Sequence, residues 1–210
     1  MVSEMTAAQQ RIHRAALELF AERGVTHVNV SDLAQAAGVA RGTIYNNLPD
    51  PDALFSDVAA QLAADMNERV TLSFEGIVDP AVRFSNGIRL YVRRAHEEPH
   101  WGRFLTRFAF SDVSLQHIWD GQPLIDLVTG LECKRFTFRK DQLSVVISMI
   151  ACSVLGAMFL VLEGHKTWRE AGADTAELIL IALGIPLDEA KALASGDLPP
   201  LPASQRTSNG

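Results

Sequence analysis

Apolar residues recur at helical spacing along nearly the whole chain, and no segment shows the alternation of apolar and polar residues that is typical of a β-strand. The predicted helices cover residues 6–23, the stretch between 29 and 38, then 40–47, 51–74, 80–97, 112–131, 139–165 and 167–183, with an aromatic-rich piece at 101–110. Residues 196–210 have no apolar period and are predicted to be a disordered tail. The pattern therefore indicates an all-α protein.

Two short helices joined by a tight turn follow the first helix, and together the three form a helix-turn-helix pattern. Asn29 is the expected cap of the second helix, with Asp32 as its capping-box partner, and Gly38 ends that helix. Small apolar residues form the predicted inner face: Ala34, Ala37, Val39, Ile44 and Leu48. The outer face of the second short helix is polar. Ala40, which precedes that helix, provides no side-chain cap.

The run VNVSDLAQAAGVARGTIYNNLPDPDAL, residues 28–54, resembles the DNA-binding region of the TetR (tetracycline-repressor-like) family of bacterial transcriptional regulators. The matching positions are Val30, Asp32, Leu33, Ala34, Ala37, Gly38, Val39, Gly42, Thr43, Ile44, Tyr45 and Leu54. The resemblance implies a helix-turn-helix DNA-binding domain over residues 1–50 and a helical domain over 51–195 that binds an effector and forms the dimer. It further implies a cytoplasmic, homodimeric one-component regulator, with repression as the expected sign, that binds a palindromic double-stranded operator.

Carried over position by position, the resemblance assigns DNA-facing roles to Asn29, Ser31, Arg41, Gly42, Thr43, Tyr45, Asn46 and Asn47. Arg41 stands where the family commonly has lysine, and Gly42 lets the backbone approach the duplex. Asn46 and Asn47 replace the usual histidine or tyrosine pair, and an asparagine amide can read adenine in the major groove.

Charge is the main departure from this resemblance. Residues 1–60 hold four arginines against seven acidic residues, a net charge of −3, and the whole chain carries −6. Pro51 and Asp52 replace a lysine–glutamate pair that is usual in the family. Because non-specific DNA affinity comes from phosphate neutralisation, we expect a shallow salt dependence. A ligand-binding or interaction module that has lost DNA binding remains an alternative.

One predicted helix contains twenty residues without a charge, LSVVISMIACSVLGAMFLVL at 143–162. Its length is sufficient to cross a bilayer, but its serines and small residues favour a buried helix or a subunit interface. Rows of small residues let two helices approach closely, so we expect this helix and the last long helix to pair with their copies in a homodimer. The expected dimer residues are Ser148, Cys152, Gly156, Leu160, Leu178 and Ile181.

Aromatic residues gather in the middle of the chain, where the resemblance places an effector site. The candidate lining residues are Trp101, Phe104, Phe108, Trp119, Met149 and Phe159, and they favour an apolar or aromatic small-molecule effector. A stripe of this kind is more often solid core, which would leave a DNA-binding regulator without a ligand.

The sequence shows no constellation that would indicate an enzyme: it has no glycine-rich phosphate loop, no nucleophile elbow and no paired carboxylates at a plausible site. No cofactor and no metal site are expected. Cys133 and Cys152 have no pairable spacing, which fits a reducing cytoplasm.

Overall fold

The structure is a computed structural model that describes residues 5–48 and 50–202, which form helices joined by turns and short loops. Its α-helices are α1 (Ala7–Arg23), α2 (Val30–Ala37), α3 (Arg41–Asn47), α4 (Leu54–Ser73), α5 (Pro80–Glu97), α6 (Pro99–Phe108), α7 (Val113–Asp120), α8 (Gln122–Glu132), α9 (Leu143–Leu162), α10 (Trp168–Ala182) and α11 (Leu187–Ser195). Short 3-10 turns, η1 (Pro51–Ala53) and η2 (Lys140–Gln142), precede α4 and α9. The predicted all-α class is confirmed.

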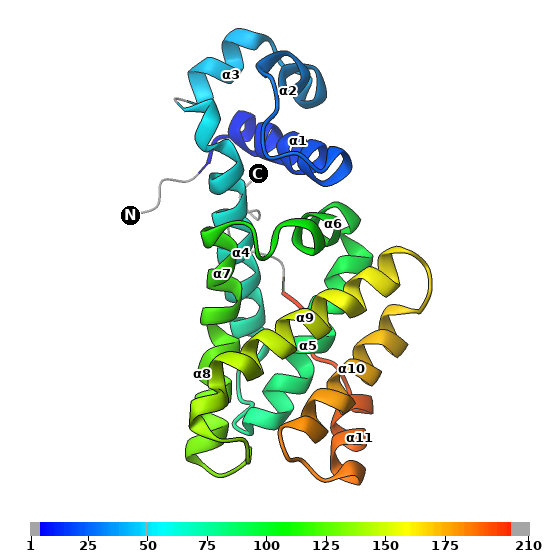
Figure 1. Cartoon of the computed structure of the whole chain (residues 1–210). Helices are drawn as coiled ribbons and strands as arrows, with labels where there is room; N and C mark the ends of the chain where they lie inside the picture. The colour runs from blue at the N-terminus through cyan, green and yellow to red at the C-terminus, as the bar shows by residue number, and fades with distance from the viewer. Residues whose placement is uncertain (1–4, 49, 203–210) are drawn as a thin grey trace.

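The helices form two parts of unequal size, a small cap and a larger bundle (Figure 1). Helices α1 to α3 form a small cap at one end, and α4 runs from this cap into a larger bundle. In the bundle, α5 is central and packs against α8, α9, α10 and α11. Helix α1 packs against both α4 and α6, so the cap rests on the bundle over two helices.

Four phenylalanine rings hold the cap and the bundle together. Phe20 comes from α1, Phe55 from α4, and Phe104 with Phe108 from α6. The Phe55 ring centroid lies 5.1 Å from that of Phe20, 5.3 Å from that of Phe104 and 5.0 Å from that of Phe108. Rings in edge contact at such distances contribute stability beyond the area they bury. We call these four residues the aromatic joint.

The single helix predicted over residues 112–131 is wrong, because the structure divides it into α7 and α8 at Gly121. A Cβ atom at Gly121 would lie 2.9 Å from the Asn67 amide nitrogen, so any larger residue there would have to displace the end of this α4 side chain. Pro123 then occupies the first turn of α8, where a proline needs no hydrogen-bond partner for its nitrogen. The break lets α7 pack mainly against α4 and α8 mainly against α5.

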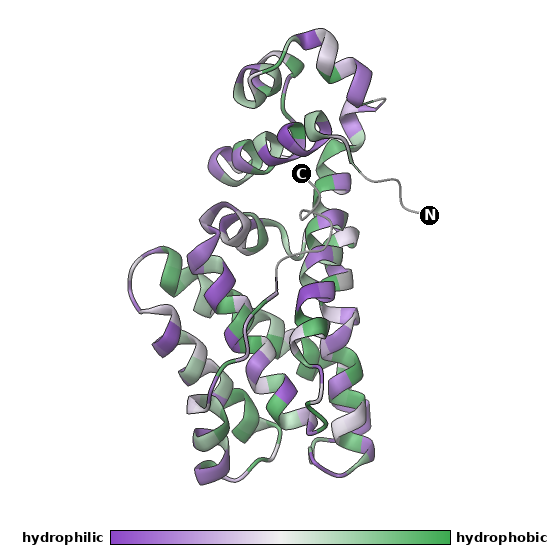
Figure 2. Cartoon of the chain, turned by 180° about the vertical axis from the view of Figure 1, so that it is seen from behind, coloured by the Kyte–Doolittle hydropathy of each residue, from purple (hydrophilic) through white to green (hydrophobic). Residues whose placement is uncertain are grey.

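Of the tail predicted to be disordered, the structure describes residues 196–202, while 203–210 lie outside the described residues. Residues 196–202, which we call the strap, run back along the bundle from α11 (Figure 2). Leu198 and Leu201 pack against the core. Arg89 of α5 donates to the Gly196 carbonyl at 2.6 Å, and Arg69 of α4 donates to the Pro202 carbonyl at 2.7 Å. Helix α11, which the apolar pattern did not predict, leads into the strap.

Helix α9 with its preceding turn, Lys140–Leu162, is the one helix in the described ranges that is long and apolar enough to cross a membrane. Its inner face is buried in the bundle through residues including Ile150, Val154 and Met158. A core helix of a globular protein has this same composition, so the length and apolarity of α9 are weak evidence for a membrane span.

Candidate functional site

The cap has the geometry of a helix-turn-helix. Gly38 adopts a left-handed conformation, with φ of 63°, and its N–H closes the end of α2 on the Ala34 and Gln35 carbonyls. Ile44 and Leu48 are buried beneath α3 and fix its inner face. Ala40 provides no side-chain cap for α3, as its sequence predicts.

The outward face of α3 carries most of the predicted DNA-facing residues. Arg41, Gly42, Tyr45 and Asn46 are exposed, and Tyr45 has 61% of its surface accessible. Thr43 and Asn47 of α3 are half-buried, as is Ser31 near the start of α2, while Asn29 is exposed. The structure therefore brings Arg41, Tyr45 and Asn46 together as a free polar surface.

Two predicted readers are engaged within the fold. The Asn47 amide donates to the Thr43 carbonyl at 2.8 Å and accepts from the Thr6 hydroxyl at 3.3 Å. Asn29 caps α2 by accepting from the Asp32 backbone N–H at 2.8 Å. The expected capping box is absent here because the Asp32 carboxylate pairs with Arg23 of α1 instead. That hydrogen bond with Arg23, more than the one from Asn29, lowers the Asp32 pKa against the opposing effect of burial.

The outer faces of α9 and α10 form a continuous exposed surface. All six residues predicted for the dimer are exposed on it: Ser148, Cys152, Gly156, Leu160, Leu178 and Ile181. Leu178 has 68% of its surface accessible. Met149 and Phe159, predicted for the effector site, also lie on this exposed face of α9. Small and apolar side chains thus lie exposed on one side of a helix whose other side is core.

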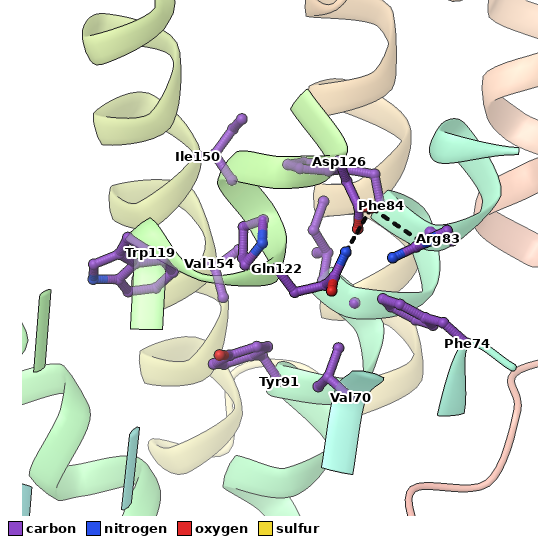
Figure 3. A pocket seen from close by; sticks show the side chains of 13 residues that line it. Val70, Phe74, Arg83, Phe84, Tyr91, Trp119, Gln122, Asp126, Ile150 and Val154 are labelled. Carbon is purple, nitrogen blue, oxygen red and sulfur yellow. Dashed lines mark hydrogen bonds and ion pairs between the residues drawn. The ribbon is translucent and has the colours of Figure 1, made fainter. Parts of the chain in front are cut away.

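A central cavity of about 30 Å³ lies between α4, α5, α7, α8 and α9. Its lining is almost entirely apolar and consists of Val70, Phe74, Arg83, Phe84, Gly87, Ile88, Tyr91, Trp119, Gln122, Pro123, Asp126, Ile150 and Val154. Figure 3 shows Tyr91 and Trp119 on one side of the cavity and the charged pair Arg83–Asp126 on another. The Tyr91 and Trp119 rings stack with centroids 6.1 Å apart.

Polar atoms in the cavity wall fall into two groups. The Asp126 carboxylate lies 3.0 Å from Arg83 Nε, so the two form an ion pair, but the angle between them is too poor for a hydrogen bond. The carboxylate also accepts a hydrogen bond from the Gln122 amide at 2.9 Å. Burial raises the Asp126 pKa, and these two partners oppose the shift. Tyr91 Oη and Trp119 Nε1 are also buried and have no hydrogen-bond partner among the described residues. Figure 3 draws both atoms on the side of their rings that lies away from the other lining side chains, and an unpaired buried donor is costly.

The predicted effector residues do not form one site. Trp119 lines the central cavity, whereas Phe104 and Phe108 belong to the aromatic joint. Trp101 is buried against Arg94, whose guanidinium carbon lies 4.5 Å from the ring centroid. The cavity instead takes residues from five helices, among them Phe84 and Asp126, that sequence reasoning did not select. Their signal was weak, since a charged or amide side chain such as Asp126 or Gln122 on an apolar helix face was the only hint available.

The described residues contain no group of three or more histidine, cysteine, aspartate or glutamate side chains that could hold a metal ion. Cys133 and Cys152 are both free and exposed.

Two family models match the chain and together cover the cap and the bundle. The model for bacterial regulatory proteins of the tetR family matches residues 12–58, and the model for the tetracyclin repressor-like C-terminal domain matches residues 79–196. These matches cover the helix-turn-helix with the start of α4, and the bundle from α5 to α11.

Individual relatives agree with the family models. The HTH-type transcriptional regulator AcrR of Shigella flexneri is 40% identical over 55 residues, 26% of each chain. An HTH-type transcriptional regulator of Mycobacterium tuberculosis is 25% identical over 99 residues, 47% of this chain and 49% of the relative. The aligned parts thus span about a quarter and about half of these relatives.

Among solved structures, RolR in complex with resorcinol is similar over 93% of this chain and 96% of its own, with a TM-score of 0.71 and 27% identity. The family consists of transcriptional regulators and not of enzymes. The chain belongs to the TetR family of bacterial transcriptional regulators and carries that family's helix-turn-helix DNA-binding domain.

Proposed function

We propose that this protein is a cytoplasmic, homodimeric repressor that binds a palindromic operator and is released by a small hydroxylated aromatic molecule held in the central cavity. The observation that carries the proposal is the exposed polar face of α3 above buried Ile44 and Leu48. One recognition helix of seven residues presents few contacts, so two copies reading adjacent half-sites are needed for specific affinity.

DNA reading would depend on hydrogen bonds more than on charge. Arg41 is the one cation on α3, and Tyr45 and Asn46 supply a hydroxyl and an amide. Such groups bond phosphates and base edges directly and release few counterions. The slope of log K against log salt should therefore correspond to about one or two neutralised phosphates per subunit.

The exposed face of α9 and α10 would form the two-fold interface. A Leu178→Arg substitution places a charge in this face without touching the core, because Leu178 is largely exposed in the single chain. Leu187→Arg on α11 is the matched control, since Leu187 is exposed to a similar extent, 61%. Sedimentation should show a monomer for Leu178→Arg and a dimer for Leu187→Arg. If both variants sediment as dimers, the interface lies elsewhere.

The central cavity would hold the ligand. Its aromatic wall suits a ring, and the Asp126 carboxylate suits a ring hydroxyl; displacement of the wall would also bring the buried, unpaired Tyr91 hydroxyl within reach of the ligand. The 27% identical relative RolR binds resorcinol, a ring of this kind. At about 30 Å³ the cavity holds only a few water-sized spheres, so a ring must displace its wall. Movement of α4 and α5 would then reach the cap through the aromatic joint and shift the population of reading-competent dimers.

The chain has two tyrosines, Tyr45 on the recognition helix and Tyr91 in the cavity wall, so substituting each one tests one of the two sites. Fluorescence anisotropy on DNA from upstream of the protein's own gene would be measured with and without resorcinol. We expect Tyr45→Phe to weaken operator binding by about threefold to tenfold per lost hydrogen bond, with release by resorcinol unchanged. Tyr91→Phe should bind the operator normally and need more resorcinol for release. Arg41→Ala should lose at least about tenfold in affinity.

If Tyr45→Phe and Arg41→Ala both bind as tightly as the unsubstituted protein, the recognition face is misassigned. A regulator without a ligand is the second candidate, and the small volume of the cavity favours it. Operator binding that resorcinol and other dihydroxybenzenes leave unchanged, with no rise in the thermal midpoint, would select this candidate.

A further inference from the structure

A second recess lies on the surface between α5, α10 and the strap, apart from the central cavity. Its volume is about 430 Å³, and its charged lining consists of Arg89 and Arg93 from α5, Arg169 from α10 and Asp197 from the strap. Three cations against one carboxylate is a local excess of positive charge on a chain whose net charge is −6. We call this recess the arginine groove.

An indole ring positions two of these cations. The Arg93 guanidinium carbon lies 5.5 Å from the Trp168 ring centroid, and that of Arg169 lies 4.2 Å from it. Arg93 Nε also pairs with Glu97 at 2.7 Å, while Arg169 makes no ion pair with any described residue. Contact with the ring orders both side chains, and because Glu97 already pairs with Arg93, the N–H groups of Arg169 are the ones left without an anionic partner.

The third cation is partly desolvated. Arg89 donates to the Gly196 carbonyl at 2.6 Å and to the Asn86 side-chain oxygen at 3.5 Å, both uncharged acceptors. Burial lowers the Arg89 pKa, and Asp197 offsets this only in part. A half-buried guanidinium with mainly neutral partners is stabilised by any anion that reaches it.

We propose that the arginine groove binds a small organic oxyanion, a molecule that presents a carboxylate or phosphate to Arg93 and Arg169. Guanidinium N–H groups in a planar fork match the oxygen spacing of both ions. The volume falls within the range of small-molecule sites and exceeds what a bare ion needs. Because α5 also lines the central cavity and α10 carries the exposed apolar face, a bound anion would fix these two helices against each other.

The three tryptophans of the chain allow each site to be observed separately. Trp168 lines the arginine groove, Trp119 lines the central cavity, and Trp101 lines neither of them. Indole N–H resonances of the ¹⁵N-labelled full chain would be assigned with Trp168→Phe and followed during titration with sodium benzoate, sodium phosphate and, at equal ionic strength, sodium chloride. We expect benzoate or phosphate to move the Trp168 resonance in a saturable manner and to leave that of Trp101 in place.

Two variants with the same charge change complete the test. Arg169→Ala removes a groove cation from an exposed position and should weaken benzoate or phosphate binding by about tenfold. Arg139→Ala removes an exposed cation that does not line the groove and should bind as the unsubstituted chain does. Equal shifts with chloride, no saturable shift with either oxyanion, or equal affinities of the two variants would each overturn the proposal. Binding of resorcinol in the central cavity would be followed by the Trp119 resonance, so a failure of the arginine groove to bind an oxyanion is distinguishable from a failure of the cavity to bind its ligand.

Discussion

Replacing Arg83 with methionine isolates the charge buried in the wall of the central cavity. The Asp126 side chain has only 5% of its surface exposed and faces Arg83 at 3.0 Å. Breaking a buried ion pair by removing one partner costs about 3–5 kcal/mol. Arg83 is itself a quarter exposed and the Gln122 amide still donates to Asp126, so we expect the lower end, about 3 kcal/mol at pH 7.5.

For a domain of this size, that loss corresponds to a fall of about 6–12 °C in the thermal midpoint. Urea unfolding at one fixed protein concentration would measure it directly, since the stability of a dimer depends on concentration. The double variant Arg83→Met with Asp126→Leu removes the stranded charge and should recover most of the loss. Arg139→Met, at a surface pair with Asp141, should change stability by less than about 0.5 kcal/mol.

The pH dependence of the Arg83→Met variant has a defined sign. Burial already raises the Asp126 pKa, and loss of the cation raises it further. A carboxyl whose folded-state pKa lies above its unfolded value favours folding at low pH and loses that contribution as pH rises through the folded pKa. The deficit of Arg83→Met should therefore shrink between pH 7.5 and pH 5. A deficit that is independent of pH, or a double variant no more stable than Arg83→Met, would refute the buried-charge explanation.

Three further substitutions test the backbone and the caps by thermal unfolding at fixed concentration. Ala40→Ser supplies the missing cap of α3 and should add about 1 kcal/mol; an unchanged midpoint would show that another group already satisfies that end. Gly184→Ala should cost at least about 2 kcal/mol, because φ is 97° and the new Cβ would lie 1.9 Å from the Thr137 hydroxyl oxygen. Gly42→Ala meets no atom within 4 Å and should add about 0.5–1 kcal/mol while weakening operator binding; unchanged affinity would remove Gly42 from the reading surface.

The reader was predictable because its signals are local. Asn29 and Gly38 mark the ends of α2 by cap chemistry, and Ile44 with Leu48 define the buried face of α3 within five residues. The exposed face of α9 was predictable for a similar reason, since residues at every fourth position share one side of a helix. The break at Gly121 was missed because the apolar period continues across it, and the side chain that approaches it, Asn67, comes from 54 residues earlier in the chain.

The lining of the central cavity was beyond sequence reasoning for a physical reason. A stripe of aromatic residues has the same pattern whether it faces a cavity or other side chains, and in α6 it faces Phe20 and Phe55. The cavity is the space that five helices leave between them, so its lining has no period along the chain. The strap was missed because its two leucines are separated by prolines and show no helical spacing.

The aromatic joint has a consequence for building hybrid regulators. A cut at residue 50, the boundary that the sequence indicates, would leave Phe20 on one parent and Phe55, Phe104 and Phe108 on the other. A transplanted reader would then meet a foreign surface on α4 and α6, with mismatched ring shapes where its α1 rests on them. Exchange of DNA specificity should instead be confined to the outward side chains of α3, or should carry all four rings together with the reader.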